Sequence, residues 1–169
     1  MRRSVAHSLA LALAVELMSS VVAWALPRQP IVFEGFPVGT IVIRTSEHQL
    51  YFVVRPGRAF IYSLGVGRLG RKWQGSASIT RKVIWPAWAP PPDILKDNPA
   101  LPALFPPGGN NPLGVAVLVL GDGTYGIHGT NKEKTIGKDV SYGCFRMMNA
   151  DIVDLYSRTE IGTPVIVQK

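Results

Sequence analysis

Short segments rich in β-branched and aromatic residues, each bounded by Gly, Pro or polar residues, recur along most of the chain. Such segments are typical of β-strands, whether they alternate apolar and polar positions or are apolar throughout. The pattern predicts a mainly β fold with a polar hairpin turn between the first two strands. The predicted strands cover residues 40–44, 49–54, 60–64, 77–84, 115–120, 124–127 and 165–167.

A single packed helix is expected to begin around Asn149. Asn149 is a favourable N-cap, and Asp151 lies in the first turn, where the helix dipole favours negative charge. Apolar residues recur at helical spacing as far as Tyr156, and Gly162 lies beyond the expected end. The sequence therefore predicts mainly antiparallel strands with one helix packed against them.

Residues 86–112 differ from the rest of the chain because they hold nine of the fourteen prolines. Proline cannot donate a hydrogen bond within a sheet, so this segment is not a central strand. Trp88, Leu101 and Phe105 provide apolar anchors, which favours an ordered loop. Long loops in compact domains are often functional. Two alternatives remain, namely a flap over a functional site and a structural wrap over the core.

The first 25 residues have the pattern of a secretory signal peptide. Two arginines precede a mostly apolar stretch, which ends in the small residues of Ala23-Trp24-Ala25. A membrane anchor is the alternative, but the apolar stretch is interrupted and shorter than the roughly 20 residues that span a bilayer. We expect a signal peptide over residues 1–25, a lead-in segment over 26–37 and one domain over 38–169, with no stable membrane insertion after cleavage.

The chain has 169 residues and a formal charge of +7, and loss of residues 1–25 would remove two Arg and one Glu. The basic residues are scattered and form no run with aromatic residues, which argues against nucleic-acid binding. An exported basic protein suits an acidic cell-wall polymer, although solubility alone also explains the charge. A single Cys excludes an internal disulfide and a Cys-rich zinc site, and three His with few clustered acids predict no metal site.

The candidate chemistry lies around Cys144, just before the predicted helix. A lone Cys is often a small buried hydrophobic residue, but its neighbours here are Gly, Ser and Arg, and a free thiol outside the cell is a liability. A thiol nucleophile needs a base, and His128 at a strand end is the only plausible one. His48 lies in a polar turn, where a solvated role is expected. The N–H groups of Gly143 and Cys144 are candidate oxyanion donors.

Two motifs carry a resemblance to a known family. His-Gly-Thr at residues 128–130 is followed by Ser-x-Gly-Cys-x-Arg at residues 141–146. Together with Gly65-Val66-Gly67-Arg68, Asn111-Pro112-Leu113-Gly114 and Gly162-Thr163-Pro164-Val165, they resemble the YkuD-type L,D-transpeptidases over residues 38–168. Tyr142 departs from this family, in which many members carry a second His at that position. Phe145 stands where a smaller aliphatic residue is common.

The resemblance implies a β-sandwich domain and cysteine acyl transfer on the tetrapeptide stems of peptidoglycan, which forms 3→3 cross-links, releases D-alanine and needs no cofactor. It assigns Cys144 as the nucleophile and His128 as its base. It assigns Gly143, Tyr142, Ser141 and Gly129 to the oxyanion hole and to orientation of the catalytic groups. It assigns Arg146, Thr130 and Asn131 to substrate binding. A structural salt bridge is the alternative to a bidentate contact between Arg146 and a stem carboxylate.

Other functions share this nucleophile and base. Water as acceptor would make the protein an L,D-carboxypeptidase or endopeptidase, whereas an amine of an envelope protein would make it a transferase that tethers that protein to the wall. A non-enzymatic wall-binding module is a more distant alternative, because a binder has no use for the Cys144–His128 pair. We expect export to the periplasm, because no wall-sorting or wall-binding segment accompanies the domain.

Overall fold

The computed structural model describes residues 28–169, so the predicted signal peptide lies outside the described residues. Within the described part, no helix is long and apolar enough to cross a membrane. Strands make up most of the regular structure. They are β1 (Ile31–Val32), β2 (Ile41–Arg44), β3 (Gln49–Arg55), β4 (Arg58–Ser63), β5 (Val66–Gly67), β6 (Gly75–Ile84), β7 (Ala116–Leu120), β8 (Tyr125–His128), β9 (Asp139–Ser141), β10 (Phe145–Arg146) and β11 (Pro164–Gln168). The helices are α1 (Pro92–Asp97), the 3-10 turn η1 (Glu133–Thr135) and α2 (Asn149–Arg158).

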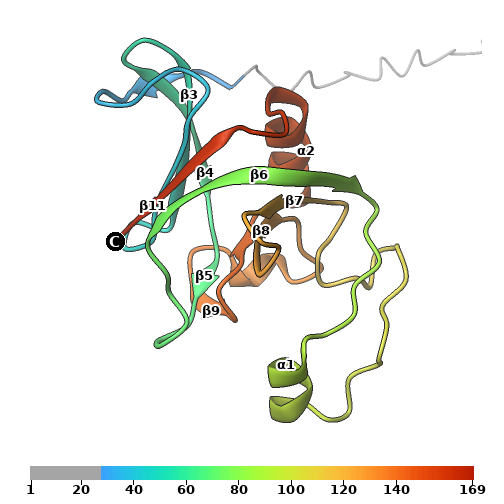
Figure 1. Ribbon diagram of the computed structural model, residues 1–169. Helices are drawn as coiled ribbons and strands as arrows, with labels where there is room; N and C mark the ends of the chain where they lie inside the picture. Colours follow the sequence, from blue (N-terminus) through green and yellow to red (C-terminus); the bar gives the residue numbers. More distant parts are fainter. Residues whose placement is uncertain (1–27) are drawn as a thin grey trace, which may run out of the picture.

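Nine strands form one sheet in the order β1-β4-β3-β2-β11-β6-β7-β8-β10, and β5 pairs with β9 in a separate ladder. The first part of β6, residues 75–78, pairs antiparallel with β11, whereas residues 79–84 pair antiparallel with β7. β6 therefore belongs to both halves of the sheet, and Figure 1 shows it crossing the molecule as one long bent strand. This bend turns the two halves toward each other as a β-sandwich.

The main core lies between the two halves of the sheet and α2. One face of α2 contributes Ile152 and Leu155, and both side chains are fully buried. The two sheet halves contribute most of the rest, because their alternate residues point inward. This core includes Ile41, Ile43, Leu50, Phe52, Tyr62, Ile79, Leu118, Leu120, Ile127, Phe145, Val165 and Val167.

All seven predicted strands are present, and no end differs from the predicted one by more than two residues. Four strands and one helix were not predicted, namely β1, β5, β9, β10 and α1. The lead-in segment 26–37 contains β1, which pairs antiparallel with β4. The prediction of a single helix missed α1, which the surrounding prolines concealed. Pro92 occupies the start of α1 and Asp93 its first turn, and both are favourable there because the missing N–H is not needed and the dipole favours negative charge.

The proline-rich segment is an ordered flap, with α1 as its outer part (Figure 1). Trp88 and Phe105 form a β-bridge that joins its two limbs. At its base, the Asn111 side-chain amide donates to the backbone carbonyls of Pro86 (2.8 Å), Phe105 (3.2 Å) and Pro106 (3.1 Å). No residue of α1 is buried. The segment is therefore closed on itself at its base and does not wrap the core, which favours the flap over the structural alternative.

Candidate functional site

The face of strands β6, β7, β8 and β10 that points away from the core forms the floor of a cavity of about 860 Å³. The pairing of β8 with β7 and β10 determines which side chains lie on this floor. His128 is opposite Val117 on β7 and beside Arg146 on β10, and Phe145 on β10 lies beside Ile127. Ile127 and Phe145 face the core, so alternation sends His128 and Arg146 to the cavity face. The same alternation places Cys144, one residue before β10, on this face beside Gly126. His128, Cys144 and Arg146 all line the cavity.

His128 is held as a base by its own backbone. Its Nδ1 lies 2.6 Å from the carbonyl oxygen of Gly129. A carbonyl can only accept, so Nδ1 carries the proton and Nε2 of the neutral ring keeps its lone pair. His128 as a whole is only 4% exposed. This tautomer is the one that a general base on the cavity face requires.

Burial sets the protonation of both groups. It lowers the pKa of His128 to about 4, and the nearby positive charge of Arg146 acts in the same direction, while the Gly129 hydrogen bond acts against it. Burial also raises the pKa of the Cys144 thiol, whereas a hydrogen bond with the Gly126 backbone and the charge of Arg146 lower it. The resting site at neutral pH therefore holds a neutral thiol and a neutral imidazole.

Ser141 shapes the loop that carries the thiol. Its hydroxyl donates to the carbonyl oxygen of Cys144 at 2.5 Å and accepts from the N–H of Gly143 at 3.1 Å. Gly143 has a φ of +123°, and an added Cβ would lie 2.6 Å from the ring of Tyr125, so only glycine fits. Because the Gly143 N–H already has an acceptor, the N–H groups of Tyr142 and Cys144 are the better candidate oxyanion donors. The assignment of an oxyanion hole stays a prediction.

Arg146 has no carboxylate within salt-bridge distance among residues 28–169, which contradicts the structural salt bridge considered for it. Its Nη1 is 3.5 Å from the hydroxyl of Thr135, and its buried Nε has no partner in the described part of the chain. Burial lowers the pKa of this guanidinium. Arg146 thus presents an uncompensated positive charge to the cavity, as a contact with a substrate anion would require.

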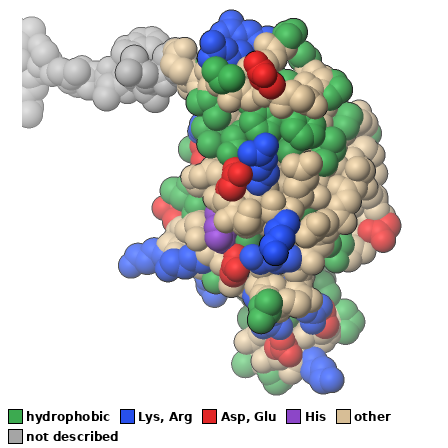
Figure 2. Space-filling view, turned by 90° about the vertical axis from the view of Figure 1, so that its left-hand side faces the viewer, with side chains coloured by type: hydrophobic (Ala, Val, Ile, Leu, Met, Phe, Trp, Pro, Cys, Tyr) green, Lys and Arg blue, Asp and Glu red, His purple; other side chains and the backbone are tan. Residues whose placement is uncertain are grey.

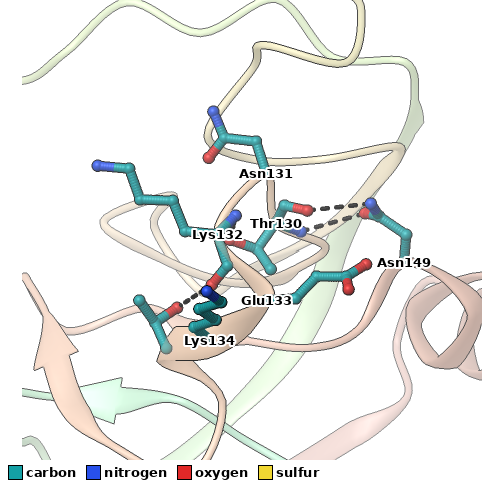
Figure 3. A pocket seen from close by; sticks show the side chains of 7 residues that line it. Thr130, Asn131, Lys132, Glu133, Lys134 and Asn149 are labelled. Atoms are coloured by element: carbon teal, nitrogen blue, oxygen red, sulfur yellow. Dashed lines mark hydrogen bonds between the residues drawn. The ribbon is translucent and has the colours of Figure 1, made fainter.

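Thr130 and Asn131 do not line the cavity that contains Cys144. They lie in a neighbouring hollow of about 610 Å³, shown in Figure 3. The backbone N–H of Thr130 donates to Asn149 Oδ1 (3.1 Å), and its carbonyl accepts from Asn149 Nδ2 (3.0 Å). The Asn131 amide donates to the carbonyl of Asn110 in the flap at 2.8 Å. Both residues hold loops together here, and their assignment to substrate binding stays a prediction.

Asn149 is not the N-cap of α2, as the sequence pattern suggested. The cap position belongs to Met148, and no side chain caps the helix there. The side-chain Oδ1 of Asn149 also accepts from the N–H of Val115 at 3.3 Å. A polar side chain at the first position of α2 therefore ties the loop after His128 to the strand that follows the flap.

Tyr142 joins the loop of Cys144 to the flap. Its hydroxyl donates to Asp97 Oδ2 at 2.9 Å and accepts from the Asn98 amide at 3.3 Å. Arg68 stacks 4.1 Å from the centre of the Tyr142 ring and binds the same Asp97 oxygen at 2.7 Å. These two partners hold the pKa of Asp97 below its usual value. Phe145, by contrast, lies in the core and forms no part of the cavity wall.

Sequence reasoning missed three contributors to the cavity. Gly126 leaves room beside the thiol, and Arg81 on β6 and Lys132 after β8 bring positive charge. The alternation of Tyr125-Gly126-Ile127-His128 gave a signal for Gly126, since it places Gly126 on the same face as His128. No sequence signal distinguished Arg81 or Lys132 from the other scattered basic residues. Figure 2 shows such residues at several separate places on one face of the molecule.

A half-buried thiol on the same sheet face as an imidazole with a free Nε2 is the arrangement of a cysteine acyl-transfer domain. The family model described as the L,D-transpeptidase catalytic domain, YkuD, matches residues 39–167, so the chain belongs to the YkuD family. The Escherichia coli (strain K12) protein named "Probable L,D-transpeptidase YbiS" is 34% identical over 149 residues, which cover 83% of this chain and 47% of that protein. The chain thus spans about half the length of the curated relatives it matches.

Solved structures share the fold. The L,D-transpeptidase from Mycobacterium smegmatis has a TM-score of 0.62 at 16% identity, covering 77% of this chain and 58% of that one. A Brucella melitensis protein named a probable carnitine operon oxidoreductase has a TM-score of 0.56 at 38% identity, covering 83% and 92% of the two chains. The mainly β architecture with α2 behind the site is therefore the architecture of L,D-transpeptidases.

Proposed function

We propose that this protein is an exported peptidoglycan L,D-transpeptidase that acts in the periplasm. The observation that carries the proposal is the placement of Cys144 and the Nε2 lone pair of His128 on the floor of one cavity. Family membership supports the same reaction class. The charge of the cavity supports an anionic substrate, because five cationic side chains line it against the single carboxylate of Asp93. These five are Arg71, Lys72, Arg81, Lys132 and Arg146.

The acylation step moves one proton and exchanges one bond. His128 Nε2 takes the thiol proton as Cys144 Sγ attacks the carbonyl carbon at the L-centre of the third stem residue. The N–H groups of Tyr142 and Cys144 stabilise the oxyanion of the tetrahedral intermediate. As this intermediate collapses, the bond to the terminal D-alanine breaks, and His128 returns the proton to the leaving amine. The product is a thioester on Cys144.

The second step releases the enzyme. An amine of a neighbouring stem attacks the thioester, His128 accepts a proton from that amine, and the thiolate leaves and is reprotonated. The new amide is a 3→3 cross-link. Water in place of the amine would give a tripeptide, as a carboxypeptidase does, and an amine on an envelope protein would give a tethered protein.

The test is mass spectrometry on residues 26–169 mixed with a purified disaccharide-tetrapeptide, beside the Cys144→Ala variant. We expect a cross-linked dimer with loss of D-alanine and an acyl adduct on Cys144, and neither product from Cys144→Ala. Because Ala is close to Cys in size, the variant should unfold at a similar temperature, which calorimetry would verify. Full activity in Cys144→Ala would remove the mechanism. Tripeptide without dimer would identify water as the acceptor, and a folded protein without adduct or product would point to a binding module.

A further inference from the structure

Arg81 is a cavity-lining arginine without a partner. Its guanidinium makes no ion pair or hydrogen bond with any residue of the described range 28–169. The neighbouring cations Arg71 and Lys72 are each paired at 2.7 Å, with Asp93 and Asp139 respectively. An exposed arginine without a partner is common on protein surfaces, so its position in the fold has to carry the argument.

A β-bulge aims Arg81 at the cavity. Ile79 is opposite Leu120, whereas Arg81 is opposite Val119, and the register shifts between these two pairs. Residues two apart on a regular strand share a face, so without the bulge Arg81 would join Ile79 on the core side. Ile79 and Leu120 are buried in the core, whereas Val119 lines the cavity. Bulges next to functional sites commonly redirect a side chain in this way.

The register then places Arg81 and the thiol in one row across the sheet. Arg81 is opposite Val119, Val119 is opposite Gly126, and Cys144 follows beside Gly126. Three strand spacings of about 4.8 Å separate the ends of the row, so the two Cα atoms lie on the order of 14 Å apart. The long side chain of Arg81 shortens the distance to the thiol.

The floor between the two ends of this row is apolar. Val119 lies between them in the row and Gly126 adds no side chain, while Val83 and Val117 line the adjacent row, which leads to His128. An alkyl chain that starts at a carbonyl above Cys144 can therefore lie over valines and end at a guanidinium. A linear diamino-dicarboxylic acid has this form, because its second carboxylate stands at the far end of an alkyl side chain.

We propose that Arg81 is a specificity-determining residue that binds the side-chain carboxylate of the third residue of the donor stem. This inference rests on the proposed function. The planar guanidinium pairs with a carboxylate through two parallel hydrogen bonds, and a carboxamide or a lysine side chain offers no such partner. Donor stems with a free side-chain carboxylate at this residue are therefore the preferred substrate class.

The experiment compares two donor tetrapeptides that differ only in the third residue, which carries a free side-chain carboxylate in one and a carboxamide in the other. The measured quantity is kcat/KM for release of the terminal residue by the wild type, Arg81→Gln and Arg58→Gln. Arg58 is the matched control, because it is exposed on β4, outside the cavity, and loses the same charge. We expect the wild type to favour the free carboxylate by about tenfold or more, the size of a charge-assisted hydrogen bond.

Arg81→Gln should lose that factor on the carboxylate stem alone and leave the carboxamide stem within about twofold, whereas Arg58→Gln should match the wild type on both. Equal losses on both stems, or none on either, would overturn the assignment of Arg81. A third stem, with a carboxamide on its terminal D-alanine, separates the two carboxylates. If the effect of Arg81→Gln vanishes with that stem instead, Arg81 binds the leaving group and the inference is wrong. No release by the wild type from any stem would overturn the proposed function itself.

Discussion

The resting state of the Cys144–His128 pair is uncharged, and the direction of both pKa shifts explains why. Burial disfavours the imidazolium as well as the thiolate. The pair therefore differs from cysteine sites in which a thiolate–imidazolium ion pair exists before substrate binds. In the proposed mechanism the proton moves as the bond to the substrate forms, and we expect Arg146 and backbone N–H groups to stabilise the charge that develops. We expect a thiol of this kind to react slowly with simple alkylating agents, because the thiolate is the reactive form.

The pH profile of acylation follows from His128. The base is lost when its Nε2 is protonated, so kcat/KM should fall as the pH drops through about 4, the pKa of the buried ring, and not near 6.5. The measurement is kcat/KM for acylation of Cys144 by a donor stem across the acid range. An acid limb centred near 6.5 would show that the imidazole is solvated in the free enzyme, in contradiction to its burial.

Stability provides a check that needs no substrate. The pKa of His128 is lower in the folded protein than in the unfolded chain, so its contribution is fully present above about 6.5 and is lost as the pH falls through about 4. The loss is on the order of 3 kcal/mol over that window. Denaturant unfolding at several pH values should show a smaller acid loss for His128→Gln than for the wild type, since titration of the carboxylates is common to both proteins.

At the scale of elements, the position of the base depends on the start of α2. Asn149→Ala should destabilise the fold by about 2–3 kcal/mol, because it leaves the buried N–H of Thr130 and its carbonyl without partners. It should also lower the acylation rate, since the loop after His128 is then free to shift. Asn149→Asp keeps the acceptor oxygen and loses only the donor, so an intermediate loss of stability is expected. Denaturant unfolding with parallel acylation rates measures both effects, and unchanged values in Asn149→Ala would refute the role of this side chain.

Seven of the strands were predictable, and Cys144 and His128 could be nominated, because each of these depends on local information. Alternation and apolar runs locate strands, and residue type alone nominates Cys144 and His128. The position of Arg81 was not predictable, because the bulge that redirects it appears only in the pairing of β6 with β7. The role of Asn149 was hidden for a similar reason. The helix starts one residue earlier than expected, so Asn149 lies inside it and its side chain binds the loop after His128 instead of capping the helix.

At the scale of the whole molecule, positive charge is scattered over the surface but concentrated in the cavity, where five cations face one carboxylate that is already paired. An anionic stem should therefore be steered into the site by a field that salt screens. We expect kcat/KM for such a stem to fall several-fold between about 0.1 M and about 1 M NaCl, as the Debye length drops from about 10 Å to about 3 Å. Alkylation of Cys144 by neutral iodoacetamide is the control and should change little. Equal salt dependence of both reactions would mean that the charges do not act on the substrate.

The position of β11 in the sheet has a consequence for synthesis of the protein. β11 is the last described strand in chain order, yet it lies between β2 and β6 and joins strands β1 to β4 to the rest of the sheet. Until a ribosome has made residues 164–168, the earlier strands have no common edge and the core cannot close. Folding of this kind, governed by contacts between distant residues, is slow compared with the growth of local structure. The cavity is therefore assembled only after residues 164–168 have been made, so a nascent chain that lacks β11 carries no assembled site around Cys144.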